Sequence, residues 1–193
     1  LIPKSRVHLS FTLKEERKGQ SGLRDLGLPE GAPFVCIYGR DTGYKDRDTG
    51  HRWSSFLNRD EKLHGYRNTS IHNYVPAAEE LARRGYFVIR MGAVVNEALQ
   101  TTNPMIIDYA NEGRTDFLDV YLGASCRCFI GCTGGAFAVA QMFRKPLVLT
   151  NYASLFDAYA YGPNVLFIPK RLWSQEKQRF LTFREIVRTD VAN

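Results

Sequence analysis

Short apolar runs alternate with helical patterns along most of the chain, and this alternation limits its fold more than any other feature. The run CRCFIG (126–131) is followed by the apolar helical pattern GAFAVAQMF (135–143) and then by PLVLTN (146–151). Continuous apolar strands are typical of parallel sheets buried on both faces, with helices as the crossover connections. We therefore predict an α/β fold, a Rossmann-like doubly wound parallel sheet with helices on both faces.

The remaining elements follow the same alternation. The helical pattern that starts near residue 74 has Pro76 in its first turn, which favours Asn73 over Ser70 as its N-cap, and Gly85 closes it. Thr115 caps a second helix, with acidic residues in its first turn where the helix dipole favours them. Further strands are predicted at 33–39, 86–92, 105–110 and 164–169, a helix at 115–125, and a capping box that opens a C-terminal helix at 182–185.

Length and composition favour a single domain. The chain has 193 residues, of which 44% are hydrophobic, and no spacer rich in proline, glycine or serine divides it. We predict one domain over residues 1–193. The sequence begins at Leu1, and we expect a piece of a longer, two-domain protein. No apolar run approaches the length of a membrane-spanning helix.

The net charge indicates which ligands the protein can bind, and the cysteines indicate its cellular compartment. A net charge of +6 favours anionic ligands. Basic residues alternate with acids, as in YKDRDTGHR (44–52), which argues against a nucleic-acid partner. The four cysteines fit free thiols and predict a cytoplasmic protein, with peripheral association with the inner face of a membrane left open. Their spacing does not fit a structural zinc site, so no metal is predicted. They are Cys36, Cys126, Cys128 and Cys132.

Polar residues and glycines follow four of the predicted strands. In doubly wound sheets, ligands bind beyond the carboxyl ends of the strands, so these residues are predicted to meet at one edge. We expect a binding site there that consists of Arg40, Asp41, Arg90, Asp108, Tyr109, Thr133, Gly134 and Gly135.

The turn GCTGG (131–135) has two interpretations. Gly134 and Gly135 can let a phosphate approach backbone N–H groups at a helix start, with the hydroxyl of Thr133 beside it. Alternatively, the glycines only allow a tight turn between strand and helix. The turn is neither a Walker motif nor a dinucleotide fingerprint, because it lacks both spacings.

Three arginines are candidates for binding an anion. Arg40 ends a buried strand and could neutralise charge on a departing diphosphate, and Asp41 follows it directly. Arg67 and Arg90 could act likewise; a strand-end arginine such as Arg90 must be paired or bound to a ligand. The alternative for each is an ordinary ion pair. Other loop candidates for a base or for stacking are His51, Trp53, His64, Tyr66 and His72.

Several ordered motifs resemble a family of bacterial glycosyltransferases with a GT-B-like fold. The similarity runs from about residue 10 to the end and includes FTLKEE, VCIYGRDTGY, IDYA and TDFLDVYLGASCRCFIGCTGGAFAVAQMFRKPLVLTN. The YGRD segment looks like the His-x-Arg element of fucosyltransferase-type enzymes, which makes Arg40 the diphosphate arginine, with Tyr38 in place of the histidine. The turn is similar to the Asp-Ser-Gly element of heptosyltransferase-like enzymes, with Cys132 in place of the acid and no histidine following.

The resemblance implies a function for the whole chain. It would be the C-terminal half of a GT-B enzyme, which binds a nucleotide-sugar donor and needs neither a metal nor another cofactor. A missing N-terminal domain would bind the glycan or other hydroxyl acceptor and supply the base, for which Asp41 is the second candidate. Asp108 and Tyr109 would read the nucleoside, Arg67, Arg90, Thr133, Gly134 and Gly135 would help to hold the donor, and the product would be a bacterial surface polysaccharide or glycoconjugate.

Two other functions stay open on the sequence. A nucleotide-sugar epimerase shares the GT-B scaffold but needs acid and base groups that face the sugar within one chain. A non-catalytic module that binds a phosphate ligand or a protein is also compatible, because Tyr38 and Cys132 depart from the motifs of the enzymes.

Overall fold

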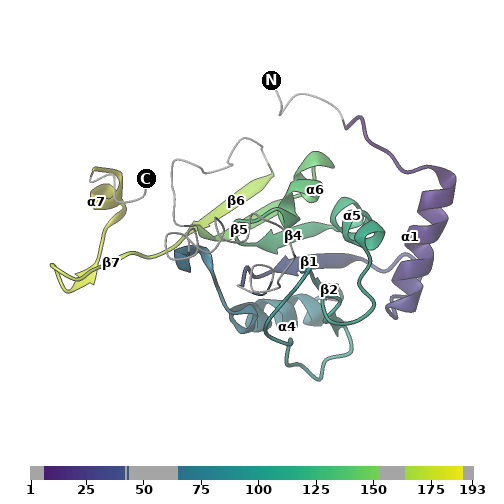
Figure 1. The fold of residues 1–193 in the computed structure, drawn as a ribbon, viewed down its shortest axis with the longest axis horizontal. Coiled ribbons are helices and arrows are strands. Elements are labelled where there is room, and N and C mark those ends of the chain that lie inside the picture. Colours follow the sequence, from purple (N-terminus) through teal and green to yellow (C-terminus); the bar gives the residue numbers. More distant parts are fainter. Residues whose placement is uncertain (1–6, 42, 44–64, 153–163, 189–193) are drawn as a thin grey trace, which may run out of the picture.

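A six-stranded sheet forms the centre of the protein (Figure 1). The computed structural model describes residues 7–41, 43, 65–152 and 164–188. Every strand pairing in this sheet is parallel, so the predicted fold class is confirmed. The strands are β1 (Phe34–Tyr38), β2 (Phe87–Arg90), β3 (Ile106–Ile107), β4 (Cys128–Gly131), β5 (Leu147–Tyr152) and β6 (Val165–Pro169).

The strand order is β3-β2-β1-β4-β5-β6. The chain enters at β1 in the middle of the sheet, moves outward to β3, and returns to the other side of β1 to form β4. This is the arrangement of a doubly wound Rossmann-like sheet, and its topological switch point lies between β1 and β4. Cys36 of β1 is paired with Ile89 on one side and Phe129 on the other.

Helices cover both faces of the sheet. The helix α4 (Val75–Arg83) packs on one face, while α5 (Asp116–Ser125) and α6 (Ala136–Met142) lie together on the other (Figure 1). Successive strand residues point to opposite faces, so Cys36 belongs to the core under α5 and α6, and Ile37 to the core under α4. Both side chains are fully buried.

The predicted N-cap of α4 was wrong. The helix begins at Val75, and Tyr74 precedes it without a side-chain cap. A 3-10 helix η3 (Ile71–Tyr74) comes first, and Ser70 caps that helix by accepting a hydrogen bond from the backbone N–H of His72 at 3.3 Å. Because η3 supplies the preceding turn, the backbone of α4 needs no cap from Asn73. Pro76 lies in the first turn, as predicted.

Other local predictions are confirmed. The Thr115 hydroxyl accepts from the N–H of Leu118 at the start of α5. The capping box of Thr182 and Glu185 opens α7 (Phe183–Arg188), with both reciprocal hydrogen bonds present. The strand predicted at 105–110 is shorter, since only Ile106 and Ile107 pair with β2.

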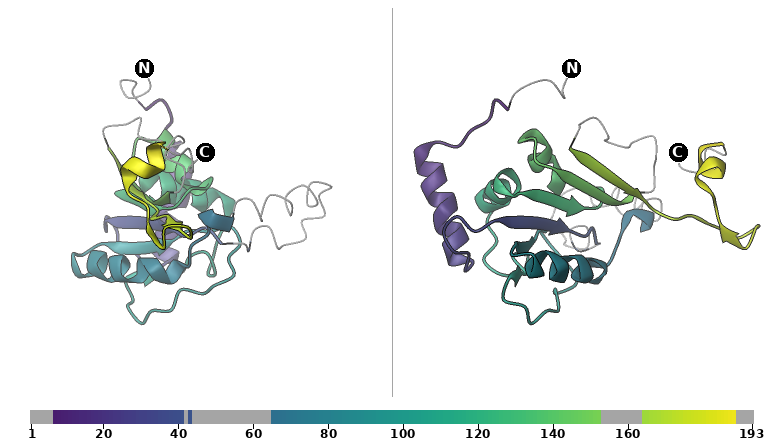
Figure 2. Two further views of the ribbon diagram at one scale, coloured as in Figure 1. Left: turned by 90° about the vertical axis from the view of Figure 1, so that its left-hand side faces the viewer. Right: turned by 180° about the vertical axis from the view of Figure 1, so that it is seen from behind.

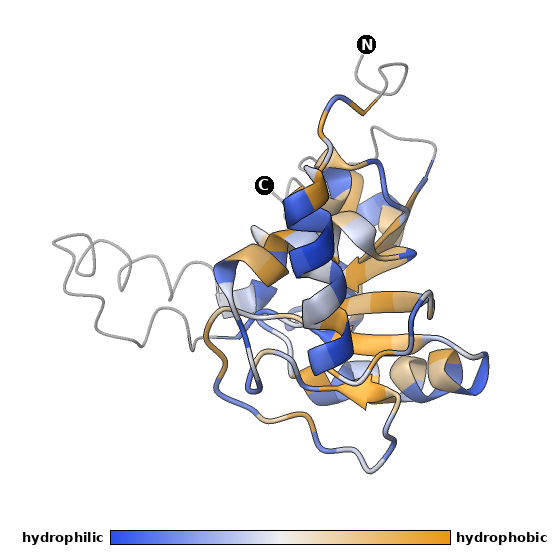
Figure 3. Ribbon diagram, turned by 90° about the vertical axis from the view of Figure 1, so that its right-hand side faces the viewer, coloured by the Kyte–Doolittle hydropathy of each residue, from blue (hydrophilic) through white to orange (hydrophobic). Residues whose placement is uncertain are grey.

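The first helix, α1 (Leu13–Asp25), was not predicted. Its signal is the capping box of Thr12 and Glu15, in which both hydrogen bonds are formed. Figure 3 shows that α1 is largely hydrophilic and lies outside the hydrophobic strands. Its residues therefore form no apolar pattern from which the helix could be predicted. The helix reaches α5 through Gly19, where a Cβ atom would lie only 2.2 Å from the ring of Tyr121.

The C-terminal arm (residues 170–188) was also missed apart from its helix. It consists of the two short antiparallel strands β7 (Trp173–Ser174) and β8 (Arg179–Phe180), followed by α7. Figures 1 and 2 show that it extends away from the sheet beyond β6. Among its exposed large apolar side chains are Trp173, Phe180, Phe183 and Val187.

Candidate functional site

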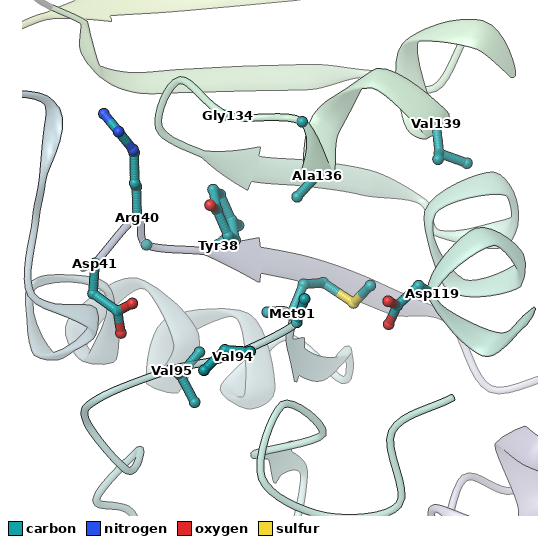
Figure 4. A pocket seen from close by; sticks show the side chains of 14 residues that line it. Tyr38, Arg40, Asp41, Met91, Val94, Val95, Asp119, Gly134, Ala136 and Val139 are labelled. Atoms are coloured by element: carbon teal, nitrogen blue, oxygen red, sulfur yellow. The ribbon is translucent and has the colours of Figure 1, made fainter. Parts of the chain in front are cut away.

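A pocket lies at the carboxyl ends of the central strands (Figure 4). Its volume is about 470 Å³. Three segments line it: residues 38–41 after β1, residues 91–95 after β2, and residues 134–136 at the start of α6. Asp119 of α5 and Val139 of α6 complete the lining.

The pocket spans the topological switch point of the sheet. The segments after β1 and β2 face the segment after β4, and the chain reverses its direction of winding between β1 and β4. Crossover connections diverge at such a point and leave a crevice between them, which is where open α/β sheets bind ligands. The position of the pocket therefore follows from the topology of the sheet.

The two glycines of the turn before α6 differ in their surroundings. A Cβ atom on Gly134 would lie 2.9 Å from Cε1 of Tyr38, so this glycine is needed for close packing. Gly135 differs, because a Cβ atom there would meet no atom of the described part of the chain within 4 Å. Its φ of −67° and ψ of −22° suit any residue. Neither packing nor backbone conformation requires Gly135, and the space beside it opens into the pocket.

Tyr38 forms part of the pocket wall at the end of β1. Its ring lies against Gly134. Burial, which disfavours the charged phenolate, raises the pKa of Tyr38 to about 12, and the neighbouring Cys132 adds to the shift. The phenol is therefore a neutral wall group at physiological pH rather than a base.

Arg40 and Asp41 both line the pocket, as predicted. The backbone N–H of Arg40 donates to Sγ of Cys132 at 2.9 Å, and its carbonyl accepts from the N–H of Thr69 at 2.9 Å. These bonds fix the backbone from which the guanidinium extends. Figure 4 shows the side chains of Arg40 and Asp41 pointing apart.

The carboxylate of Asp41 joins two loops. Oδ1 accepts from the N–H of Gly43 at 2.9 Å, and Oδ2 accepts from the N–H of Asn96 at 2.8 Å. Both oxygens thus hold the segment after β1 against the segment after β2. Asp41 therefore has a structural contact at the rim, and the base role named for it as the second candidate stays a prediction.

Arg90 and Asp108 bind each other. Nη1 of Arg90 lies 2.9 Å from Oδ1 of Asp108 and donates to the carbonyl of Glu97 at 2.7 Å. Oδ2 of Asp108 accepts from the N–H of Leu99 and from Asn111. Only 1% of the Arg90 side chain is exposed. The strand-end arginine is therefore paired internally, and neither residue lines the pocket described above.

Tyr109 is fully buried. Its phenol oxygen lies 2.9 Å from both the carbonyl oxygen of Thr115 and Oδ1 of Asp119, and it accepts from the N–H of Thr115 at 3.1 Å. Burial raises the pKa of Tyr109 well above its ordinary value. A nucleoside therefore cannot contact Tyr109 in this structure. The phenol of Tyr109 instead contacts the carboxylate of Asp119.

Asp119 lines the pocket, although the sequence analysis treated the acidic residues in the first turn of α5 only as partners of the helix dipole. Its Oδ2 lies 2.7 Å from Nη2 of Arg114, and 28% of its side chain is exposed. Sequence periodicity could not reveal this position, because it depends on how α5 lies beside α6 and the end of β2.

Thr133 and Arg67 lie at the same edge of the sheet but not in the pocket lining. Oγ1 of Thr133 is buried and has no hydrogen-bond partner among the described residues. Arg67 belongs to the 3-10 helix η2 (Gly65–Arg67), and its carbonyl accepts from Asn151 of β5 at 3.2 Å. The candidates His51, Trp53 and His64 lie outside the described residues.

In the described part of the chain, no group of three or more histidine, cysteine, aspartate or glutamate side chains is arranged to hold a metal ion. No helix there combines the length and the apolar character needed to cross a bilayer.

Comparison with known proteins identifies the fold. No family model matches the sequence, and no curated protein matches it. The structure is similar to that of ADP-heptose lps heptosyltransferase II from E. coli, with a TM-score of 0.56 and 17% identity over 87% of this chain and 46% of that chain. It is also similar to a family 9 glycosyl transferase from Veillonella parvula, with a TM-score of 0.52 and 10% identity over 95% of this chain and 52% of that chain.

These likenesses show a shared fold. The chain spans about half the length of each of the two solved structures. The α/β sheet expected from the apolar runs is therefore the sheet found in part of two glycosyltransferases.

Proposed function

We propose that this chain is the donor-binding half of a glycosyltransferase, which binds a nucleotide sugar in the pocket at the switch point and transfers the sugar to an acceptor hydroxyl. The observation that carries the proposal is the position of the pocket. It lies across the ends of β1, β2 and β4, where sheets of this kind bind nucleotides. The similarity to two glycosyltransferases, one of them named for ADP-heptose, supports the choice of a sugar nucleotide.

In the proposed complex, the diphosphate lies between Arg40 and the open turn. The guanidinium of Arg40 faces the phosphates and stabilises the negative charge that develops on the leaving group. The backbone at Gly134 and Gly135 approaches the phosphates closely, since none of the residues that the structure describes fills the space of a Cβ atom on Gly135. In this proposal, the Arg40 side chain and the backbone N–H groups of the turn neutralise the charge on the diphosphate, without a cofactor or a metal ion.

The proposed reaction is an inverting displacement. The acceptor oxygen forms a bond to the anomeric carbon while the bond from that carbon to the phosphate oxygen breaks. The nucleoside diphosphate leaves with the electron pair, and a base takes the hydroxyl proton. We place the base, together with the acceptor site, in the other half of a longer protein, with Asp41 as the second candidate because its carboxylate also holds two loops together.

This proposal also sets the biological context. The enzyme would act in the cytoplasm or at the inner face of the membrane, and its product would belong to a bacterial surface polysaccharide or glycoconjugate. Arg67, Arg90, Asp108 and Tyr109 are not part of the proposed donor site, because they do not line the pocket. Thr133 remains a candidate through its unpartnered buried hydroxyl beside the turn.

Nucleotide binding tests the proposal directly. A ligand held by the native state raises the melting temperature by mass action. We expect one of ADP, GDP, CDP and UDP to stabilise the chain clearly, and Arg40→Ala to weaken its binding about tenfold or more in calorimetric titration.

Arg127→Ala is the matched control. Arg127 is exposed and directly precedes β4 at the opposite end of the sheet from the pocket. The Arg127→Ala substitution removes the same positive charge as Arg40→Ala but changes no residue of the pocket. If none of the four nucleotides stabilises the protein, or if Arg40→Ala and Arg127→Ala bind equally well, the proposed donor site is wrong.

A further inference from the structure

Charged side chains line both ends of the pocket. Figure 4 shows Arg40 and Asp41 at one end and Asp119 at the other, with Tyr38 and Met91 between them. Because the side chain of Asp41 points away from that of Arg40, the guanidinium can receive an anionic group at the first end, while Asp119 can accept hydrogen bonds from a ligand at the other. This polarity orients a nucleotide, because a carboxylate repels phosphate and accepts N–H or O–H groups.

Contacts with Tyr109 and Arg114 fix the orientation of the Asp119 carboxylate. Oδ1 lies 2.9 Å from the phenol oxygen of Tyr109, and Oδ2 lies 2.7 Å from Nη2 of Arg114. An ionised carboxylate has about four lone-pair positions. One contact on each oxygen leaves each of them able to accept another hydrogen bond. The fixed rotamer and the remaining acceptor capacity make Asp119 a preorganised acceptor.

The surroundings of Asp119 within the pocket are apolar. Met91 lies beside it, and Ala136 and Val139 of α6 line the same end. Apolar walls reduce competition from water, so a hydrogen bond to the carboxylate is stronger there than on an open surface. The same walls offer a surface for a flat base or for the carbon face of a sugar.

We propose that Asp119 is a specificity-determining residue that accepts hydrogen bonds from the nucleoside part of the ligand, while the diphosphate lies toward Arg40. This inference rests on the proposed function and adds the orientation of the ligand to it. Two adjacent donors fit a carboxylate, and a nucleoside offers them either as the ribose 2′- and 3′-hydroxyls or as N–H groups on the base edge.

A pair of variants separates recognition from structure. Asp119→Asn keeps the shape but replaces one acceptor oxygen with a donor. Asp116→Asn is the control, because Asp116 also lies 2.9 Å from Nη2 of Arg114 but its side chain is 95% exposed. We expect Asp119→Asn to bind the preferred nucleoside diphosphate about tenfold more weakly, with inorganic pyrophosphate binding and Asp116→Asn both close to wild type.

Ligand analogues test the same contact without any substitution. On the wild-type chain, the 2′-deoxynucleotide removes one ribose donor, and a nucleotide methylated on its base N–H removes a base donor. We expect one of the two to bind about tenfold more weakly, which also identifies the donor that Asp119 accepts.

The outcomes separate this inference from the proposed function. If the wild type binds neither nucleotides nor pyrophosphate, both are wrong. If nucleotides bind but Asp119→Asn and both analogues match the wild-type values, only the role of Asp119 is overturned. Equal weakening of nucleotide and pyrophosphate by Asp119→Asn would also overturn it, since that is the result of a general distortion of the pocket.

Discussion

At the scale of single residues, two adjacent glycines in the turn before α6 are present for different reasons. Gly134 allows the turn to lie against the ring of Tyr38, and a Cβ atom there would overlap the ring. Gly135 has a backbone conformation open to any residue, and no described residue fills the space where its side chain would be. The first glycine is therefore required for packing, and we predict that the second leaves room for a ligand.

Alanine at each position should have opposite effects on stability. Gly134→Ala should destabilise the protein by about 1–3 kcal/mol through overpacking against Tyr38. Gly135→Ala should stabilise it by about 0.4–1 kcal/mol, because it restricts the unfolded chain without strain. The same methyl group should weaken nucleotide binding. Urea denaturation and calorimetric titration measure the two effects, and unchanged nucleotide affinity in Gly135→Ala would show that the ligand does not use this space.

Tyr38 provides a prediction on pH. Its pKa is raised from 10.0 to about 12 in the folded protein, mainly by burial. Its contribution to stability is complete below pH 10 and is lost as the pH rises toward 12, because the unfolded chain ionises first. Tyr38→Phe should therefore lose less stability than the wild type across this range. The other buried tyrosines titrate in both proteins, so the difference in free energy of unfolding isolates Tyr38; parallel curves would contradict the shift.

At the scale of elements, a buried ion pair fastens β2 to the segment after β3. Arg90 ends β2, Asp108 directly follows β3, and each also bonds to the loop at residues 97–99. The pair holds the loop after β2 in place, and residues 91–95 of that loop line the pocket. Arg90 and Asp108 thus stabilise a loop that forms part of the pocket wall, although neither residue lines the pocket.

Breaking this pair should be costly. Arg90→Met leaves the Asp108 carboxylate without its cationic partner and should reduce the free energy of unfolding by about 3–5 kcal/mol. Arg84→Met is the control, since its pair with Glu80 is largely exposed and should matter little. Urea denaturation of both variants measures the difference. A small effect of Arg90→Met would mean that water or another group replaces the guanidinium.

At the scale of the whole molecule, the sheet and the C-terminal arm are spatially distinct. Figures 1 and 2 show the arm beyond the edge strand β6. Glu185 of α7 bonds to Arg179, Lys177 and Thr182, all within the arm. Lys170 at its start bonds to the carbonyls of Tyr152 and Tyr66. The pocket lies at the central strands, away from these contacts.

Removal of residues 171–193 should therefore leave the sheet folded. We expect the melting temperature to fall by no more than about 4 °C, which corresponds to about 1 kcal/mol for a protein of this size. Nucleotide affinity should match that of the intact chain. Differential scanning calorimetry and titration provide the measurements, and loss of binding in the shortened chain would place the arm in the site.

Local patterns in the sequence were sufficient for the parallel sheet. An apolar run such as that of β1, which lies between Pro33 and Gly39, predicts a strand buried on both faces of the sheet. This prediction requires no information on which strands pair with it. Caps such as Thr115 and Thr182 were readable because the groups that they bond lie within three residues. The α1 helix was missed because its hydrophilic surface weakens the apolar pattern, although its capping box was present.

The sequence by itself determined the strands of the central sheet with the helices between them, their parallel arrangement and the edge at which strand-end residues gather. Only the tertiary structure decided which of those residues face the pocket. Arg90 and Tyr109 turned inward to partners, while Asp119, read as a helix-dipole acid, lines the cavity. The reason is that periodicity depends on neighbours within a few residues. A side chain's exposure at the switch point depends instead on how strands and helices distant in sequence pack together.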